Sequence, residues 1–204
     1  GLVREGEQID APIHFVKDKL SSKLKINIPG ITQQENAHLA VSTLKYINNF
    51  DIPMTVIQNG LETVQWFGRN QHIQHNPLVI FDVAHNIESL QSFLEYYSTL
   101  GISGKSFLII ALQARKQIQP LISKLQKVFN HIICTESPGH NPMAVDVLGT
   151  FFTNKNQIDI IPNPEKAIQL GIEKLKPQDG MAIIGSHCLG PAVSKVFKIT
   201  FDKY

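Results

Sequence analysis

The apolar residues of this chain follow two patterns that indicate different secondary structures. Short continuous apolar runs are typical of strands buried on both faces of a parallel sheet, whereas recurrence at three- and four-residue steps predicts helices with one buried face. From about residue 70 the two patterns alternate. The predicted strands are 71–74, 78–81, 107–112, 132–135, 158–161 and 181–184, and the predicted helices are 87–100, 118–129, 143–152, 164–175 and 189–197. This alternation predicts an α/β fold with a doubly wound, mostly parallel, six-stranded sheet and helices on both faces.

The segment before residue 70 has a different pattern. Residues 13–16 and 24–28 are predicted to be strands, with Pro29-Gly30 as a turn. A helix is expected from about Gln33 to Asn48, because apolar residues line one face there, and a second from Pro53 towards Val64. The change in pattern indicates that two domains contribute to the chain.

Composition excludes some classes of protein. The 204 residues are 43% hydrophobic, which is enough to bury a sizeable core, and the net charge is only +2. No dense basic stripe favours nucleic acid, and no apolar run is long enough to cross a bilayer. Cys134 and Cys188 are isolated in the sequence, so we expect a protein of the reducing cytoplasm. The chain begins with Gly rather than Met, and we expect it to be a piece of a longer protein.

A polar cluster follows the apolar run 78–81, where a strand is predicted to pass into a helix. It consists of Asp82, His85 and Asn86. Asp82 alone would suit a strand end and Asn86 a helix cap. Together with an imidazole, however, they form a donor and acceptor set at the edge where open α/β sheets bind ligands. A carboxylate there suits ribose hydroxyls, and the imidazole or amide suits phosphate or a second substrate.

Four motifs occur in an order that resembles a known family. They are the segment 30–40, which includes Asn36, the pair Gly68-Arg69, the cluster 82–86 and the pair Gly185-Ser186. In this order and approximate spacing, they resemble the C-terminal half of folylpolyglutamate synthase and dihydrofolate synthase, a branch of the Mur ligase family. The resemblance covers nearly the whole chain.

The resemblance implies a domain organisation and an activity. Residues 1–65 would be the C-terminal remainder of the central ATP-binding domain, 66–76 the hinge and first strand, and 77–204 the Rossmann-like Mur ligase C-terminal domain. The implied reaction is ATP-dependent addition of L-glutamate to a folate or pteroate carboxylate through an acyl phosphate. The sequence has no phosphate-binding loop. In the family that loop and the Mg²⁺ ligands precede this region, so residues 1–204 are expected to be inactive alone.

The resemblance also implies roles for individual residues. Asn36, Arg69, Asp82 and Asn86 would bind the nucleotide. His85 and Ser186 would act in catalysis, by orienting glutamate or the closing interface. A guanidinium in the hinge could hold phosphates bidentately, and Asn36 is expected in the first turn of its helix, where backbone N–H groups are free.

The chain departs from the family pattern at several positions. Thr32 stands where relatives often have His, and Phe67 replaces a usual Pro, so we expect a less rigid hinge. The family's Asp-Lys-Asp loop is replaced by 112–117, and Met143 stands where an Arg is common. Arg115 and Lys116 are candidates to bind the amino-acid carboxylates instead.

Three hypotheses follow. The first is the folate enzyme, expected to be a monomer that binds neither nucleic acid nor membrane. The second is a Mur-type ligase with another acceptor or amino acid, and the third is a non-catalytic nucleotide-binding module. A metal site is not predicted, because the Cys and His residues lack paired ligand spacing, and His72 and His75 on a strand should point to opposite faces.

Overall fold

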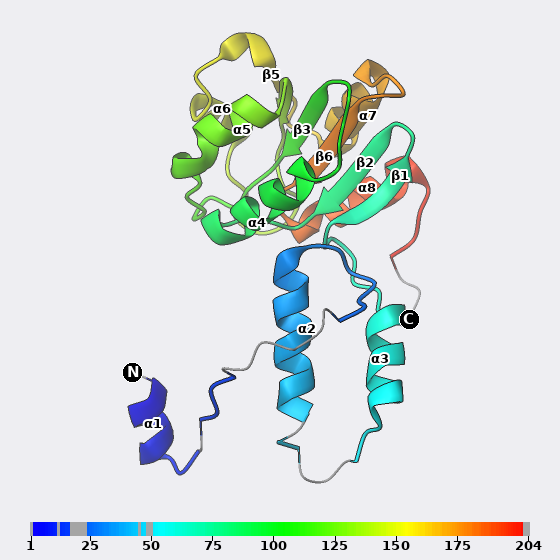
Figure 1. The fold of residues 1–204 in the computed structure, drawn as a ribbon. Helices are drawn as coiled ribbons and strands as arrows, with labels where there is room; N and C mark the ends of the chain where they lie inside the picture. Colours follow the sequence, from blue (N-terminus) through cyan, green and yellow to red (C-terminus); the bar gives the residue numbers. More distant parts are fainter. Residues whose placement is uncertain (1, 12, 17–23, 45, 48–50, 202–204) are drawn as a thin grey trace. The chain divides into compact units, whose positions relative to one another are not determined.

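A computed structural model describes residues 2–11, 13–16, 24–44, 46–47 and 51–201, and it divides the chain into two compact units (Figure 1). The first unit comprises residues 1–27 and 32–64, and the second comprises 28–31 and 65–204. The assignment of 1–65, 66–76 and 77–204 to domains of a ligase stays a prediction.

The described residues of the first unit include three helices and no strand. The unit contains α1 (Leu2–Gln8), which the sequence analysis missed, α2 (Ile31–Leu44) and α3 (Met54–Thr63). Leu24, Ala37 and Val41 form its small buried cluster, with Ile57 and Leu61 of α3 packed against it. The two helices predicted around 33–48 and 53–64 are confirmed, with small shifts of their ends.

The strands predicted at 13–16 and 24–28 are wrong. Residues 13–16 and 24–28 have no strand pairing. The hydrogen bonds of Asn27 instead go to the end of α3, where its N–H donates to Leu61 O at 2.9 Å and its Nδ2 donates to Val64 O at 3.0 Å. These donors satisfy carbonyl groups that a helix end leaves unpaired. The segment 24–28, predicted to be a strand, therefore pairs with the C-terminal end of α3 instead.

The second unit contains the six-stranded sheet. Its strands, in the spatial order β1-β2-β6-β3-β4-β5, are β1 (Gln71–His75), β2 (Leu78–Asp82), β3 (Ser106–Ile110), β4 (His131–Cys134), β5 (Ile158–Ile160) and β6 (Gly180–Ile184). Only β1 pairs antiparallel, with β2, and the other pairs are parallel. The predicted fold class and all six strands are confirmed. Five-residue runs buried throughout form β3 and β6 at the centre.

Helices cover both faces of this sheet (Figure 1). One face is packed by α4 (Ile87–Ser98), α5 (Ile122–Val128) and α6 (Val145–Thr150), and the other by α7 (Pro164–Lys174) and α8 (Gly190–Phe197). Alternate residues of one strand enter different cores. Leu108 and Ile110 face the first set of helices, whereas Phe107 and Ile109 face the second. Short 3₁₀ turns at Gln119–Leu121, Lys155–Gln157 and His187–Leu189 complete the connections.

Candidate functional site

The carboxyl ends of three neighbouring strands form the candidate site. Asp82 of β2 and Ile110 of β3 both pair with Ile184, the last residue of β6. The chain leaves β6 towards α8 on one face, whereas it leaves β2 and β3 towards α4 and α5 on the other. In open α/β sheets, ligands usually bind at the strand ends where the connections reverse in this way.

Asp82 is the buried carboxylate of this edge, at 6% exposure. Its Oδ2 accepts the N–H of Asn70 and its Oδ1 accepts the N–H of Ala84, both at 2.7 Å. Burial raises the pKa of Asp82, and the N–H groups of Asn70 and Ala84 and the charges of Arg69 and His85 oppose that rise. A carboxylate accepts about four hydrogen bonds, so two positions remain for a ligand or water.

The turn that carries Arg69 is fastened to the end of β2. Val83 N donates to Gly68 O at 2.9 Å, next to the bond between Asn70 and Asp82. Gly68 has φ 70°, and a Cβ there would lie 2.5 Å from Val83 Cγ1, so only glycine fits. These contacts fix the main-chain position of the half-buried Arg69 near Asp82.

Phe67, immediately before this turn, packs against the C-terminal segment. Its ring centroid lies 5.0 Å from that of Phe201, which also lies 6.0 Å from Phe81 of β2. This aromatic contact gives the turn a support that the sequence did not indicate. The expectation of a less rigid hinge stays a prediction.

Asn70 is a site residue that the sequence analysis missed. It is 5% exposed, has φ 46°, and donates from Nδ2 to Pro29 O at 2.9 Å. Its Oδ1 is buried with no hydrogen-bond partner among the described residues. The available signal was its place after Gly68-Arg69, because Asn tolerates the left-handed conformation of such turns.

His85 is oriented by its own backbone neighbours. Its Nδ1 lies 2.8 Å from Val83 O, and its N–H donates to Ser89 Oγ at 3.0 Å. Since a carbonyl only accepts, Nδ1 carries a hydrogen, and Nε2 has a lone pair whenever the ring is in its neutral form. His85 thus offers an acceptor at the site edge.

Asn86 caps α4. Its Oδ1 accepts the N–H of Ser89 at 2.8 Å, and Ser89 Oγ accepts the N–H of Asn86 at 3.2 Å, which forms a reciprocal capping box. The capping alternative is thus present in the structure. A nucleotide contact by the same side chain stays a prediction.

Gly185 and Ser186 follow β6 at the centre of the edge. Gly185 has φ 107°, and a Cβ there would lie 1.9 Å from Ala111 O, so the chain needs glycine to pass β3. Ser186 is 4% exposed, and its Oγ accepts the N–H of Cys188 at 3.1 Å. The hydroxyl hydrogen of Ser186 stays available to donate.

Arg115 and Lys116 lie on the loop after β3, and Arg115 is exposed. This loop pairs with the loop before α6: Ala114 N donates to Asn141 O at 3.1 Å, and Met143 N donates to Leu112 O at 2.9 Å. Met143 itself is 5% exposed and belongs to the core. The pairing therefore holds the candidate cations near the position where the family commonly has Arg.

Asn36 belongs to the first unit, in α2. Its expected place in the first turn is wrong, because α2 begins at Ile31, directly after Gly30 with φ 116°. Asn36 therefore lies in the second turn, where backbone N–H groups are already paired within the helix. Its side chain is exposed and donates to Gln33 Oε1 at 3.4 Å.

The expected separation of His72 and His75 is also wrong. Their ring centroids lie 5.3 Å apart, and His72 Nε2 lies 2.7 Å from the hydroxyl of Tyr96. A register shift between His72 and Gln74 explains this, since an extra residue in a strand reverses the alternation of faces. Within the described part of the chain no three His, Cys, Asp or Glu side chains gather as a metal site.

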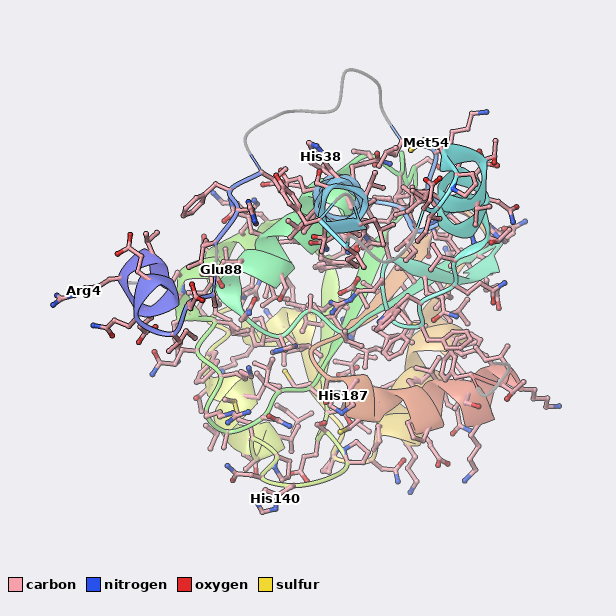
Figure 2. The ribbon with its side chains drawn as sticks, turned by 90° about the horizontal axis from the view of Figure 1, so that it is seen from below. Arg4, His38, Met54, Glu88, His140 and His187 are labelled. Carbon is pink, nitrogen blue, oxygen red and sulfur yellow. The ribbon has the colours of Figure 1, made fainter. Side chains whose placement is uncertain are left out.

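The two cysteines differ in their surroundings. Cys134 is buried, and burial raises the pKa of its thiol to about 12. Cys188 is half-buried, with Sγ 3.6 Å from Nε2 of the exposed His187. Figure 2 labels His187 just before α8, and His140 on the loop between β4 and α6.

The fold and this edge define an α/β domain with a topological switch point. Residues 68–187 match the family model of the Mur ligase, glutamate ligase domain. The chain belongs to this family. The matched range includes Arg69, Asp82, His85, Asn86, Arg115, Lys116 and Ser186.

Two curated relatives illustrate the range of the family. The chain is 24% identical over 177 residues to a dihydrofolate synthase/folylpolyglutamate synthase of Buchnera aphidicola, covering 85% of the chain and 41% of that protein. It is also 24% identical over 179 residues to a UDP-N-acetylmuramoyl-L-alanyl-D-glutamate–2,6-diaminopimelate ligase of Buchnera aphidicola, covering 85% of the chain and 35% of the relative. The chain thus spans about two fifths of the first relative.

Solved structures share the fold. Mycobacterium tuberculosis folylpolyglutamate synthase, complexed with ADP and AMPPCP, matches with a TM-score of 0.81 at 16% identity, over 98% of this chain and 52% of the other. A bifunctional folylpolyglutamate synthase/dihydrofolate synthase with Mn, AMPPNP and L-glutamate bound matches with a TM-score of 0.74 at 21% identity, over 85% and 41%. No helix in the described ranges is both long and apolar enough to traverse a bilayer.

Proposed function

We propose that this chain is the C-terminal part of an ATP-dependent amide ligase that adds L-glutamate to a folate or pteroate carboxylate. The observation that carries the proposal is the glutamate ligase domain at 68–187, which contains Asp82, His85 and Ser186 on one edge of the sheet. A folate or pteroate substrate is proposed because one curated relative is a dihydrofolate synthase/folylpolyglutamate synthase.

ATP would supply the phosphoryl group that activates the carboxylate, and two residues of the edge suit a nucleotide. Asp82 keeps two acceptor positions for hydroxyl groups after its bonds to Asn70 and Ala84. Arg69 is half-buried on a fixed turn and carries a charge that suits phosphate. Asn36 and Asn86 are further nucleotide candidates. Mg²⁺ would be held by residues outside this chain.

His85 and Ser186 would act at the amino-acid side of the reaction. The Nε2 lone pair of His85 can accept a hydrogen bond from the amine of glutamate and keep it directed at the reacting carbon. The buried Ser186 hydroxyl can donate to a substrate carboxylate while its oxygen accepts from Cys188. Arg115 and Lys116 would hold the other negative charge of the amino acid.

The domain proposal rests on the cores of the two units. The first unit has a cluster of three buried apolar residues in its described part, which supports its being a portion of a larger ATP-binding domain. The second unit has a core on each face of a complete sheet. A cytoplasmic location is proposed as well, supported by two free cysteines, together with a monomeric state.

A second candidate is a Mur-type ligase with another amino acid or acceptor. Met143 is buried in the core rather than presented to the site, so the cation common in the family at that position is missing. The relationship to the diaminopimelate ligase supports the same alternative. The two candidates differ in substrate and share the proposed reaction.

The test is ATP turnover by the full-length protein with dihydropteroate, tetrahydrofolate or a muramyl precursor, each with glutamate and with diaminopimelate. Glutamate-dependent ADP release with a pterin substrate supports the folate enzyme. His85→Ala should lower kcat about 10²-fold or more, whereas His75→Ala, an exposed strand residue, should leave it unchanged. No turnover with any pair would contradict both ligase candidates.

A further inference from the structure

A cavity of about 700 Å³ lies at the sheet edge opposite Asp82 and Ser186. Its wall includes residues at or near the beginnings of three strands, namely Lys105 and Phe107 at β3, His131 at β4 and Asp179 before β6. Lys174 and Lys176, at and after the end of α7, complete the group of cations. Strands β3 and β6 each have five residues, so about 17 Å of strand separates this edge from the ligase edge.

Asp179 organises the mouth of this cavity. It is 4% exposed, and its two carboxylate oxygens accept the N–H groups of Lys105 at 2.7 Å and Lys176 at 2.9 Å. A Cβ on Gly104 would lie 2.2 Å from Asp179 Oδ1, so the loop packs directly on the carboxylate. The buried acid therefore faces backbone, and it fixes the main chains of two lysines side by side.

The remaining charges leave the cavity cationic. Asp159 accepts from His131 Nε2 at 2.8 Å and from Lys174 Nζ at 3.4 Å through the same oxygen. Burial opposes ionisation, but these partners hold the pKa of Asp159 below its ordinary value. Lys105 and Lys176 have no acidic side-chain partner within the part of the chain that the structure describes. Three lysines thus outnumber two acids, although Lys174 already pairs with Asp159.

We propose that this cavity binds a small polyanion, which presents at least two phosphate or carboxylate groups to Lys105, Lys174 and Lys176. Its volume lies within the roughly 300–1,000 Å³ of small-molecule sites, and the three lysines among its lining residues favour an anionic ligand. Lysine ammonium groups suit phosphate and carboxylate oxygens as mobile point charges. Because the two edges are separate, the polyanion and the ligase substrates bind at the same time.

The test uses the full 204-residue chain with two probes, tripolyphosphate and citrate. Calorimetry at about 0.1 M salt, where charges beyond about 10 Å are screened, measures affinity. Backbone NMR shifts of Lys105, His131 and Lys176 locate the site. Saturable binding of either probe supports the proposal, and the tighter probe identifies a phosphorylated or a polycarboxylate ligand.

Matched variants separate a built site from general charge. Lys105→Gln with Lys176→Gln should weaken binding at least about tenfold. Lys124→Gln with Lys127→Gln removes the same charge from exposed positions of α5 outside this cavity, and should change it by less than about twofold. Equal melting temperatures establish that the variants fold. Absence of binding, shifts elsewhere in the chain, or equal effects of the two pairs would overturn the proposal.

Discussion

The N–H of Asn70 donates to Oδ2 of Asp82 across 2.7 Å, between residues twelve positions apart. Ala84 N donates to the other carboxylate oxygen, Oδ1. The Asp82 side chain therefore joins the end of β2 to the turn that carries Arg69. The residue predicted to bind nucleotide therefore also builds the site. A substitution at Asp82 should affect both stability and nucleotide use.

Asp82→Asn tests this double role. The neutral amide loses the charge-assisted bonds to ribose, so KM for ATP in the full-length protein should rise. One backbone N–H would face the amide NH₂, which should lower the unfolding free energy by about 1–3 kcal/mol. Urea denaturation and steady-state kinetics measure the two effects. Asp146→Asn, at an exposed position of α6, is the control, and an unchanged KM would remove Asp82 from the nucleotide site.

Asn86→Ser and Asn86→Ala separate capping from ligand binding. Serine keeps a capping oxygen and removes the amide, whereas alanine removes both and should cost about 1 kcal/mol of stability. If Asn86 contacts the nucleotide, both variants raise KM for ATP in the full-length protein. A serine variant with normal stability and normal KM would leave Asn86 with the capping role only.

Gly185→Ala should be far more damaging than Gly101→Ala. Both glycines have positive φ, of 107° at Gly185 and 62° at Gly101. A Cβ added at Gly101 would have open space, whereas a Cβ added at Gly185 would lie 1.9 Å from Ala111 O. The control therefore reports the conformational cost alone, about 1–3 kcal/mol. Thermal unfolding should show a clearly larger loss for Gly185→Ala. Equal losses would mean that the contact with β3 relaxes freely.

Arg115→Ala tests the compensation for Met143. A bidentate bond to a substrate carboxylate in a closed site is worth about 1.5–3 kcal/mol, so KM for glutamate should rise roughly ten- to a hundredfold. KM for ATP should barely change. Arg4→Ala, on the exposed helix α1 (Figure 2), is the matched control. Glutamate dependence within about twofold of the unchanged protein would favour a different amino-acid substrate.

His72 should make stability depend on pH. Burial, and next the charge of His75, lower the pKa of His72 from 6.5, so the folded state prefers the neutral ring. The unfolded chain takes up the proton first as pH falls, and the unfolding free energy should therefore decrease from 6.5 down to the lowered folded value. Urea denaturation across this range should show a flatter profile for His72→Gln. His140→Gln, exposed on its loop, should keep the original slope.

Local patterns sufficed for the elements of the second unit. Strand β6 is predicted by a continuous apolar run, and helix α4 by apolar residues on one face. Both patterns can be recognised in the sequence because they depend only on the spacing of neighbouring residues. The same holds for the position of the polar cluster after β2. The family motifs added the glutamate ligase domain, which the match at 68–187 confirms.

Only the tertiary structure decided which distant groups meet. Strand order places β6 between β2 and β3, and this brings Ser186 to the edge of Asp82. Asn70 belongs to the site because its N–H donates to Asp82, at the end of a strand that comes later in the chain. Residues 24–28 do not form a strand, and Asn27 instead hydrogen-bonds to the end of α3. Likewise, one register shift brought His72 beside His75. Periodicity is a property of adjacent residues, whereas hydrogen-bond partners are chosen across the fold, where the unpaired polar groups of one segment must find those of another.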